Sequence, residues 1–340
     1  MAQHFLLSSS SKQLSLYDVM MMSDEQVFET FKNVRWNSTG GKPVCPSCGV
    51  VDRYYFIKTR EKFRCKDCDH TFSLTSKSIF ASRKLGLRVY LTALVIFVNS
   101  AKGVSSLQMS RYLGTSYKTA WVLMHKIREA LLNTRDETPL KGICEIDGLY
   151  TGHYIRPKNH KQKRIDRRKA YKPSKRTIIS MKQRVTSASD PNIVGADRTL
   201  TFITKGEDFS EIKNIVYNYI KPGSELHADE HIGYDPFNAH YDLQRVNHSQ
   251  EYCGVHGENN NQCESFNGRF RRLIKGQCHR LSTLYLSNYA NEIAYREDMR
   301  RKDNKTIFND VLSRCLNSPP SNEFAGYWKG NKRVAERLYA

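Results

Sequence analysis

Three acidic residues occupy positions in the sequence from which they could hold divalent metal ions. Asp147 ends the strand-like run 142–147, and Asp229 ends a second such run, 224–229. Glu264 lies near the start of an expected helix that begins at residues 260–261. Two acids at strand ends and one acid on a helix can meet around metal, and carboxylate oxygens are the ligands that Mg²⁺ and Mn²⁺ prefer. Such a site would support metal-dependent hydrolysis of a phosphodiester.

The helix that carries Glu264 is expected to be amphipathic. Glu264, Asn267 and Arg271 share one face, three and four residues apart. Arg271 would suit a phosphate oxygen, although a surface ion pair between Glu264 and Arg271 is the simpler alternative. Glu145 lies on the same strand face as Asp147 and is the best decoy for a metal ligand. The apolar stripe of the helix recurs at helical spacing and comprises Cys263, Phe266, Phe270 and Leu273.

A second metal site is indicated by two Cys-x-x-Cys pairs. They are Cys45 with Cys48 and Cys65 with Cys68, separated by 16 residues. This spacing is typical of a four-thiolate zinc site, and four protein ligands would make the one Zn²⁺ structural. A redox pair and accidental spacing are the competing interpretations. The segments between the pairs, around residues 54–56 and 62–64, are expected to form a hairpin.

The composition favours a polyanionic partner. The chain has 340 residues, a formal charge of +20 and an isoelectric point near 9.5, which points to nucleic acid or an acidic membrane face. No apolar run is long enough to span a membrane, and the N-terminus lacks the basic flank of a secretory signal. Nine cysteines, of which four form the two pairs, fit metal binding in a reducing cytosol better than a disulfide framework.

The N-terminal half is expected to be helical on either side of the zinc module. Helices are predicted over 23–31, where Ser23 and Gln26 form a capping box, and over 85–99. Residues 105–121 predict a helix-turn-helix with its turn at Gly114. Its expected core comprises Leu107, Leu113, Ala120 and Met124, whereas the side chains expected to be free for DNA are Tyr117, Lys118 and His125.

After a polar linker at 134–139 the pattern changes to strands. Strands are predicted at 143–147, 177–185, 198–203, 225–229 and 243–246, with helices at 209–220 and from 260. This order predicts an α/β catalytic domain of the ribonuclease-H-like fold, with a mixed five-stranded sheet and helices. The zinc ribbon and the helical helix-turn-helix module precede it.

A basic run, 156–176, separates the first two expected strands. It holds eleven Lys or Arg residues against one acid, Asp166. A solvated loop is the plain alternative, but beside a metal site the run would contact DNA phosphates. The expected contacts are Arg156, Lys163, Arg164, Arg167 and Arg168.

These motifs together resemble the zinc-ribbon insertion-sequence transposases with a DDE catalytic domain, of the ISXO2-like type. The resemblance spans roughly residues 25 to 330. Besides the two cysteine pairs, it rests on Glu145-Ile146-Asp147-Gly148, Arg164-x-Asp166-Arg167-Arg168, His227-Ala228-Asp229-Glu230, Asn261-x-x-Glu264-Ser265-Phe266 and the run 289–298. Gly148 departs from relatives that carry a second acid there.

The resemblance implies a transposase that binds the terminal inverted repeats of its element. It would cleave DNA with two Mg²⁺ (or Mn²⁺) ions per active site and join the 3′-hydroxyl ends to target DNA. It assigns Asp147, Asp229 and Glu264 as metal ligands and Arg271 as a catalytic residue. The implied partner is double-stranded DNA at transposon ends and target, in a homodimer or larger synaptic complex. The implied location is the cytoplasm, at the bacterial nucleoid.

The expected organisation is an N-terminal helical segment (1–35), a zinc ribbon (36–82), a helix-turn-helix module (83–134), the catalytic domain (140–300) and a C-terminal tail (301–340). Two other functions remain open. A DNA-binding regulator could keep the N-terminal modules and lose the activity, but the intact triad favours an enzyme. A ribonuclease-H-like nuclease or resolvase would share the metal site without obvious need of two N-terminal DNA-binding modules.

Overall fold

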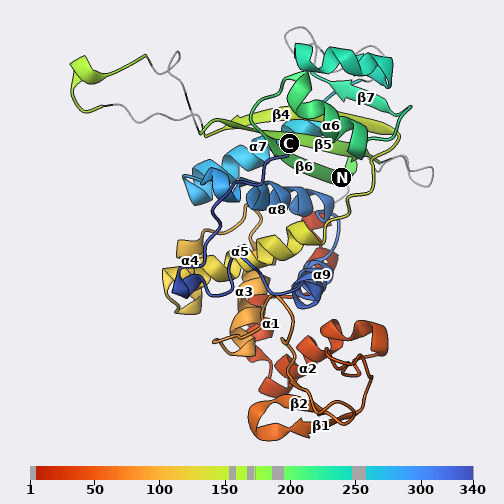
Figure 1. Cartoon of the computed structure of the whole chain (residues 1–340), viewed down its shortest axis with the longest axis vertical. Helices are drawn as coiled ribbons and strands as arrows, with labels where there is room; N and C mark the ends of the chain where they lie inside the picture. Colours follow the sequence, from red (N-terminus) through yellow and green to blue (C-terminus); the bar gives the residue numbers. More distant parts are fainter. Residues whose placement is uncertain are drawn as a thin grey trace. The chain divides into compact units, whose positions relative to one another are not determined.

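The computed structural model describes residues 5–152, 158–166, 172, 174–185, 195–246 and 258–339. The chain divides into two units (Figure 1). Unit 1 comprises Met1–Arg135 and Met299–Arg333, and unit 2 comprises Asp136–Asp298 and Val334–Ala340. Most of the expected C-terminal tail therefore belongs to unit 1. In the described part of the chain, no helix is long and apolar enough to cross a membrane.

Unit 1 begins with two capped helices. Helices α1 (Leu16–Met21) and α2 (Asp24–Arg35) each start at a serine whose hydroxyl accepts a backbone N–H three residues on. At Ser23 the expected capping box forms, because the Gln26 side chain accepts the Ser23 N–H in return, at 2.7 Å. The helix continues four residues beyond the predicted end, to Arg35.

The predicted hairpin of the zinc module is confirmed and gains a third strand. Strands β1 (Tyr54–Ile57), β2 (Lys62–Cys65) and β3 (Thr71–Phe72) form an antiparallel sheet in that order. Its small core is aromatic: Phe63 is buried and its ring lies 5.4 Å from Phe72 and 5.5 Å from Trp36, between centroids. A core of so few side chains needs reinforcement, which a metal bound by the cysteines would supply.

The rest of unit 1 is a helical group formed by α3 (Leu87–Asn99), α4 (Ser106–Leu113), α5 (Tyr117–Asn133) and α9 (Asn304–Asn317). The turn between α4 and α5 uses Gly114 at φ +60°, a conformation that favours glycine. The expectation that Leu107 packs inside is wrong: its side chain is 51% exposed. Met109 and Ser110 face the core instead. Met109 is two positions after Leu107 and therefore lies about 200° round the helix from it, on the opposite face.

Unit 2 contains the predicted mixed five-stranded sheet. The strands are β4 (Ile143–Thr151), β5 (Arg176–Arg184), β6 (Ala196–Thr204), β7 (Glu225–Ala228) and β8 (Asp242–Arg245). Their order is β6-β5-β4-β7-β8. Strands β4, β5 and β6 pair antiparallel, whereas β7 lies parallel to β4 and β8 parallel to β7. This arrangement is consistent with the ribonuclease-H-like fold.

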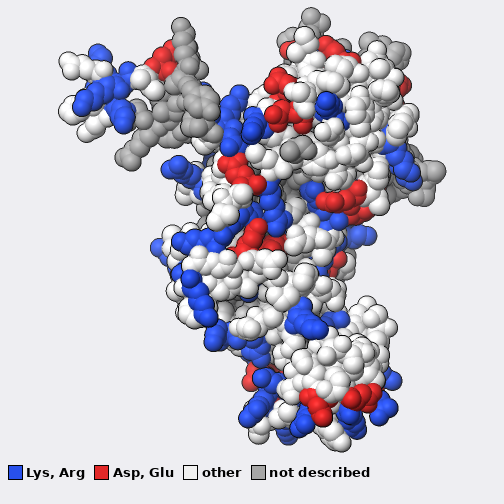
Figure 2. Space-filling model, in the orientation of Figure 1, with Lys and Arg blue, Asp and Glu red and all other residues white. Residues whose placement is uncertain are grey.

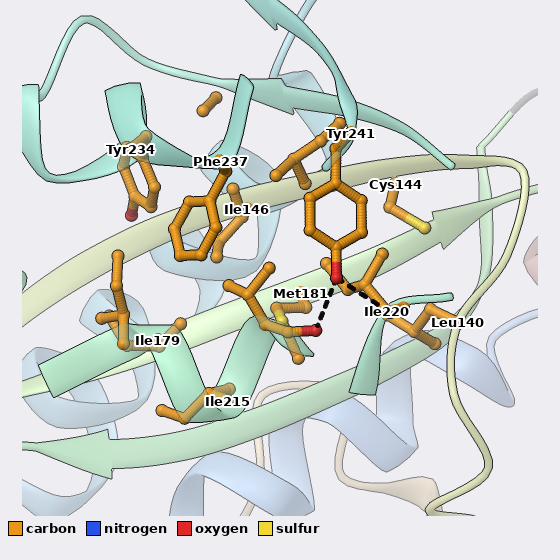
Figure 3. Close-up of a cluster of buried hydrophobic side chains, with 14 of the residues drawn as sticks. Leu140, Cys144, Ile146, Ile179, Met181, Ile215, Ile220, Tyr234, Phe237 and Tyr241 are labelled. Atoms are coloured by element: carbon orange, nitrogen blue, oxygen red, sulfur yellow. Dashed lines mark hydrogen bonds between the residues drawn. The ribbon is translucent and has the colours of Figure 1, made fainter. Parts of the chain in front are cut away.

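Helices cover both faces of this sheet because β4 and β5 are apolar on both faces. Cys144 and Ile146 face a cluster with Ile212 and Ile215 of helix α6 (Phe209–Tyr219), drawn in Figure 3. Leu149 faces a second cluster, to which α7 (Asn261–Leu273) and α8 (Leu286–Asp298) contribute. The stripe predicted for α7 is buried as expected. Shorter helical turns are η1 (Phe5–Leu7), η2 (Ser9–Ser11), η3 (Asn37–Thr39), η4 (Lys58–Arg60), η5 (Lys161–Lys163), η6 (Ile232–Ala239), η7 (Ile274–Cys278), η8 (Thr283–Tyr285) and η9 (Tyr327–Lys329).

Candidate functional site

A cluster of three carboxylates lies where β7 ends beside β4, the central strand of the unit 2 sheet. Asp147, Glu207 and Asp229 each offer an oxygen, and these oxygens all lie within 4.8 Å of one another. The strand pairing explains why the two aspartates meet. Strands β4 and β7 are parallel neighbours, and Ile146 stands opposite Ala228, so the next residue on each strand is an aspartate. Clustered oxygen ligands of this kind suit Mg²⁺ or Mn²⁺.

In the absence of a cation, the environment of Asp147 disfavours the ionised form of its carboxylate. Its carboxylate accepts the Gly148 N–H at 2.8 Å and the Asn267 side-chain amide at 2.6 Å. Burial, then the negative charges of Asp229 and Glu207, raise the pKa of Asp147 to about 8. A divalent cation would reverse this effect, because it favours the ionised carboxylates that now repel one another.

Glu207 is the member of the cluster that the sequence analysis missed. It lies between β6 and α6, is 4% exposed, and accepts a hydrogen bond from the Tyr234 hydroxyl at 2.7 Å and another from Tyr150. Burial raises its pKa. The residue opposite it is Gly148, where an added Cβ would lie 2.2 Å from the Glu207 carboxyl carbon. The carboxylate of Glu207 therefore occupies the space that a side chain at position 148 would need.

Glu264 lies beside this cluster rather than within it. Among the described residues, the group of oxygens within 4.8 Å includes Asp147, Glu207 and Asp229 but not Glu264. Glu264 is exposed on the first turn of α7, and its negative charge is among the causes that raise the pKa of Asp147. Asn267, one turn further along α7, contacts Asp147 directly. The face of α7 that carries Glu264 is therefore turned toward the cluster, and Arg271 is exposed further along the helix.

Glu145 fixes the start of α7 against β4. Its carboxylate is fully buried and accepts the backbone N–H groups of Gln262 at 2.8 Å and Cys263 at 3.1 Å. Arg184 of β5 donates to the same carboxylate at 2.7 Å and to the Asn259 carbonyl at 2.7 Å. A carboxylate at a helix N-terminus satisfies N–H groups that have no partner within the helix. Glu145 thus positions the helix that bears Glu264.

The four paired cysteines of unit 1 converge as predicted. The sulfur atoms of Cys45 and Cys68 lie 3.6 Å apart, as do those of Cys48 and Cys65, and all four lie within 4.8 Å of one another. Four thiolates about 2.3 Å from a tetrahedral Zn²⁺ stand roughly 3.8 Å apart, so this geometry fits the ion. All four ligands come from the protein, which leaves no open position and makes the site structural.

Of the three side chains of α5 that were predicted to contact DNA, two are exposed in the structure and one is buried. Tyr117 and Lys118 are exposed at the start of α5, as expected. The expectation that His125 is free for DNA is wrong, because its ring is fully buried, 4.2 Å from Trp121 and 5.4 Å from Phe324 between centroids. Burial, with the charges of Arg128 and Arg333, keeps the pKa of His125 well below its usual value.

The basic run between β4 and β5 is described in part. Lys163 and Arg164 are exposed, and the Arg164 guanidinium donates to the carbonyls of Lys158 and Asn159 within the same segment. Arg156, Arg167 and Arg168 lie outside the described residues. At the C-terminal end of the run, the Lys175 ammonium lies 4.0 Å from the centroid of Tyr150. Since Tyr150 donates to Glu207, this end of the run is close to the carboxylate cluster.

Comparison with known proteins gives two family matches and a relative. Residues 139–298 match the model of the ISXO2-like transposase domain, and residues 22–71 match that of the transposase zinc-ribbon domain. A protein of Halobacterium salinarum, described as an uncharacterized protein in transposable element ISH50, is 26% identical over 312 residues. The alignment covers 87% of this chain and 98% of that protein. Both the carboxylate cluster and the cysteine cluster lie inside the matched domains.

Proposed function

Because this chain belongs to the insertion-sequence transposases with an ISXO2-like domain and a zinc ribbon, we propose that it cleaves DNA at the ends of its element and joins the freed 3′-hydroxyl groups to target DNA. The observation that carries the proposal is the meeting of Asp147, Glu207 and Asp229 beside the central strand of the sheet. Three carboxylates that destabilise one another without a cation are a poor structural network and a good metal site.

The proposed metal ligands are Asp147, Asp229 and Glu264, with Glu207 as a fourth acid. The bound ions, Mg²⁺ or Mn²⁺ and about two per site, would activate a water and neutralise charge on the phosphate. Asp147 is central, because it neighbours every other acid of the site. Glu264 lies at the surface, where its side chain can reorient toward a cation shared with Asp147.

Neighbouring side chains would hold these acids in place. Asn267 fixes one oxygen of Asp147, and the hydroxyls of Tyr234 and Tyr150 fix Glu207. Glu207 is buried and doubly hydrogen-bonded, so it would act through a fixed oxygen, whereas Glu264 would adapt. Arg271, exposed further along α7, is proposed to bind a DNA phosphate.

Double-stranded DNA at the transposon ends and the target is the proposed partner. Tyr117 and Lys118 at the start of α5 would enter the DNA groove from the helix-turn-helix. Lys163 and Arg164 would contact the backbone beside the catalytic domain. A homodimer or larger synaptic complex is proposed, because cutting and joining two transposon ends requires both to be held together. One structural Zn²⁺ would stabilise the N-terminal module.

The test is a cleavage and strand-transfer assay on duplexes that carry the element's own ends. Asp147→Ala, Asp229→Ala and Glu264→Ala are each expected to bind the duplex and to lose Mg²⁺-dependent nicking and joining. Asp242→Ala is the matched control, because this acid is exposed at the start of β8 on the same sheet. Wild-type protein that binds ends without cutting them would indicate a regulator instead.

The fourth acid is tested in the same assay. Glu207→Gln keeps the shape of the side chain, and its amide oxygen can still accept from the Tyr234 hydroxyl, while the charge is removed, so folding should be retained. Reduced cleavage with an increased Mg²⁺ requirement is expected for a ligand. Wild-type cleavage by Glu207→Gln together with inactive Glu264→Gln would restrict the metal site to the three acids predicted from the sequence.

A further inference from the structure

The segment 321–333 packs on α5 and closes one side of the helix-turn-helix. Phe324 is 2% exposed, and its ring lies 5.7 Å from Trp121 and 5.4 Å from His125, between centroids. The buried Ser321 hydroxyl donates to Glu129 of α5 at 2.6 Å. Residues roughly two hundred positions apart in the chain thus share one apolar cluster, which belongs entirely to unit 1.

The loop 324–332, which we call the tryptophan loop, is held in shape by its own contacts. The Asn331 amide donates to the carbonyls of Asn322 and Ala325, both at 2.7 Å. Gly326 and Gly330 take φ values of +73° and +99°, which glycine adopts without strain. Arg333 donates to Glu323 at 2.7 Å and joins the two ends of the loop. The loop therefore presents η9 in a defined position.

What this loop presents is aromatic and basic. Tyr327 packs 5.1 Å from Trp121, and the Lys118 ammonium lies 5.2 Å from the Tyr327 centroid. Trp328 is 71% exposed, and the Lys329 ammonium lies 5.0 Å from its ring. Lys332 is also exposed, and the sequence 324–333 contains no acid. Figure 2 shows Lys and Arg along the edge of unit 1 where α4 and η9 lie in Figure 1.

An exposed tryptophan beside several cations is a surface for a polyanion with an apolar component. Tryptophan is enriched at interaction sites because its ring combines a large apolar area with an N–H donor. The cations of this surface repel a basic partner. Duplex DNA is complementary to it, because the DNA phosphates are negatively charged and the sugars offer apolar surface. Lys118 joins the loop to the first turn of α5, so one continuous surface carries both.

We propose that the tryptophan loop is a second DNA-contacting element of the helix-turn-helix, in which Trp328 packs on the sugars or base edges of duplex DNA while Lys329 and Lys332 bind its phosphates. This inference rests on the proposed function, since it requires that unit 1 binds transposon ends. It extends the interface from α5 to a segment near the C-terminal end of the chain.

The first experiment uses the intrinsic fluorescence of the zinc-loaded full-length protein. Of its three tryptophans, Trp36 is 5% exposed and Trp121 is half-buried, so acrylamide should quench mainly Trp328. A duplex carrying the element end should protect the wild-type protein from this quenching. Trp328→Phe should show little quenching with or without the duplex. Quenching that the duplex leaves unchanged would overturn the proposal.

The second experiment measures affinity for the same duplex. Trp328→Ala should weaken binding about fivefold or more, as expected for an aromatic anchor. Lys329→Gln should flatten the slope of log affinity against log salt by about 0.9, one phosphate contact. Tyr17→Ala and Lys12→Gln are the matched controls, because both residues are exposed elsewhere in unit 1. Their binding should equal that of the wild type.

The outcomes separate this inference from the proposed function. If the wild type binds the duplex and the Trp328 and Lys329 variants bind it equally well, the loop does not contact DNA and the proposed function stands. If the wild type binds no duplex, both fail. Protection of Trp328 that depends on protein concentration, without DNA, would assign the surface to self-association and also overturn the proposal.

Discussion

Removal of the Glu145 carboxylate should both destabilise unit 2 and impair catalysis. In Glu145→Ala, the Arg184 guanidinium and two backbone N–H groups of α7 lose their shared acceptor in a fully buried position. Breaking a buried ion pair from one side costs about 3–5 kcal/mol. For a unit of this size each kcal/mol lowers the melting temperature by about 2–4 °C, so the expected loss is roughly 6–20 °C.

The catalytic consequence follows from what the contact positions. Without the Glu145 carboxylate, the first turn of α7 loses its attachment to β4, and Glu264 and Asn267 lose their placement beside Asp147. Cleavage below the thermal transition should therefore fall and should require more Mg²⁺. Glu145→Gln is the comparison, because its amide oxygen still accepts the two helix N–H groups while its charge is lost.

Thermal unfolding and single-turnover cleavage at varied Mg²⁺ test this reasoning together. Both the melting temperature and the cleavage rate should be highest for the wild type, lower for Glu145→Gln and lowest for Glu145→Ala. If Glu145→Ala melts and cleaves as the wild type does, Glu145 does not position α7. A lower melting temperature with an unchanged rate and Mg²⁺ requirement would show that the contact is structural only.

Three further outcomes are expected. Cys65→Ser should release the zinc, measured by metal analysis, and weaken end binding while unit 2 stays folded; a protein without stoichiometric zinc would contradict this. Because the folded pKa of Asp147, about 8, lies above its usual 3.8, the stability that its protonated form contributes is complete below pH 3.8 and is lost progressively as the pH rises from 3.8 to about 8. The melting temperature of metal-free protein should fall over this window, and less so in Asp147→Asn. Neutralising Lys163 and Arg164 together should flatten the salt dependence of DNA binding by up to about two slope units, whereas an unchanged slope would leave the run a solvated loop.

The meeting of Asp147 and Asp229 could be predicted because each follows an apolar strand-like run, and the two runs form parallel neighbouring strands. The expectation that Asp147 ends its strand is wrong, because β4 continues to Thr151, whereas Asp229 directly follows the end of β7. The position of Glu207 could not be predicted, because it follows no strand end directly and is placed by its hydrogen bonds to Tyr234 and Tyr150. Gly148 was the available signal: a glycine beside a metal-binding aspartate indicates that another group needs the space. Glu264 was placed on the correct face of its helix, but its distance from the other acids depends on packing that periodicity does not encode.

The error at His125 has a similar cause. His125 lies seven positions after Lys118, so both lie on one face of α5, as the helical period predicts. That face is covered at His125 by Phe324, which comes from a segment about two hundred residues later. Local pattern gives the direction of a side chain, whereas the segment that covers it depends on long-range contacts. The zinc cysteines were predictable because their spacing within each pair already fixes much of their geometry.

The most direct test of the central claim is the number of Mn²⁺ ions bound by the complex of the protein with an end duplex, measured by electron paramagnetic resonance. The carboxylate cluster predicts about two tightly bound Mn²⁺ ions for the wild type. It predicts none at this site when Asp147 and Asp229 are both changed to asparagine, with duplex binding retained. Equal Mn²⁺ binding by the wild type and this double variant would contradict the claim that these acids hold the catalytic metal.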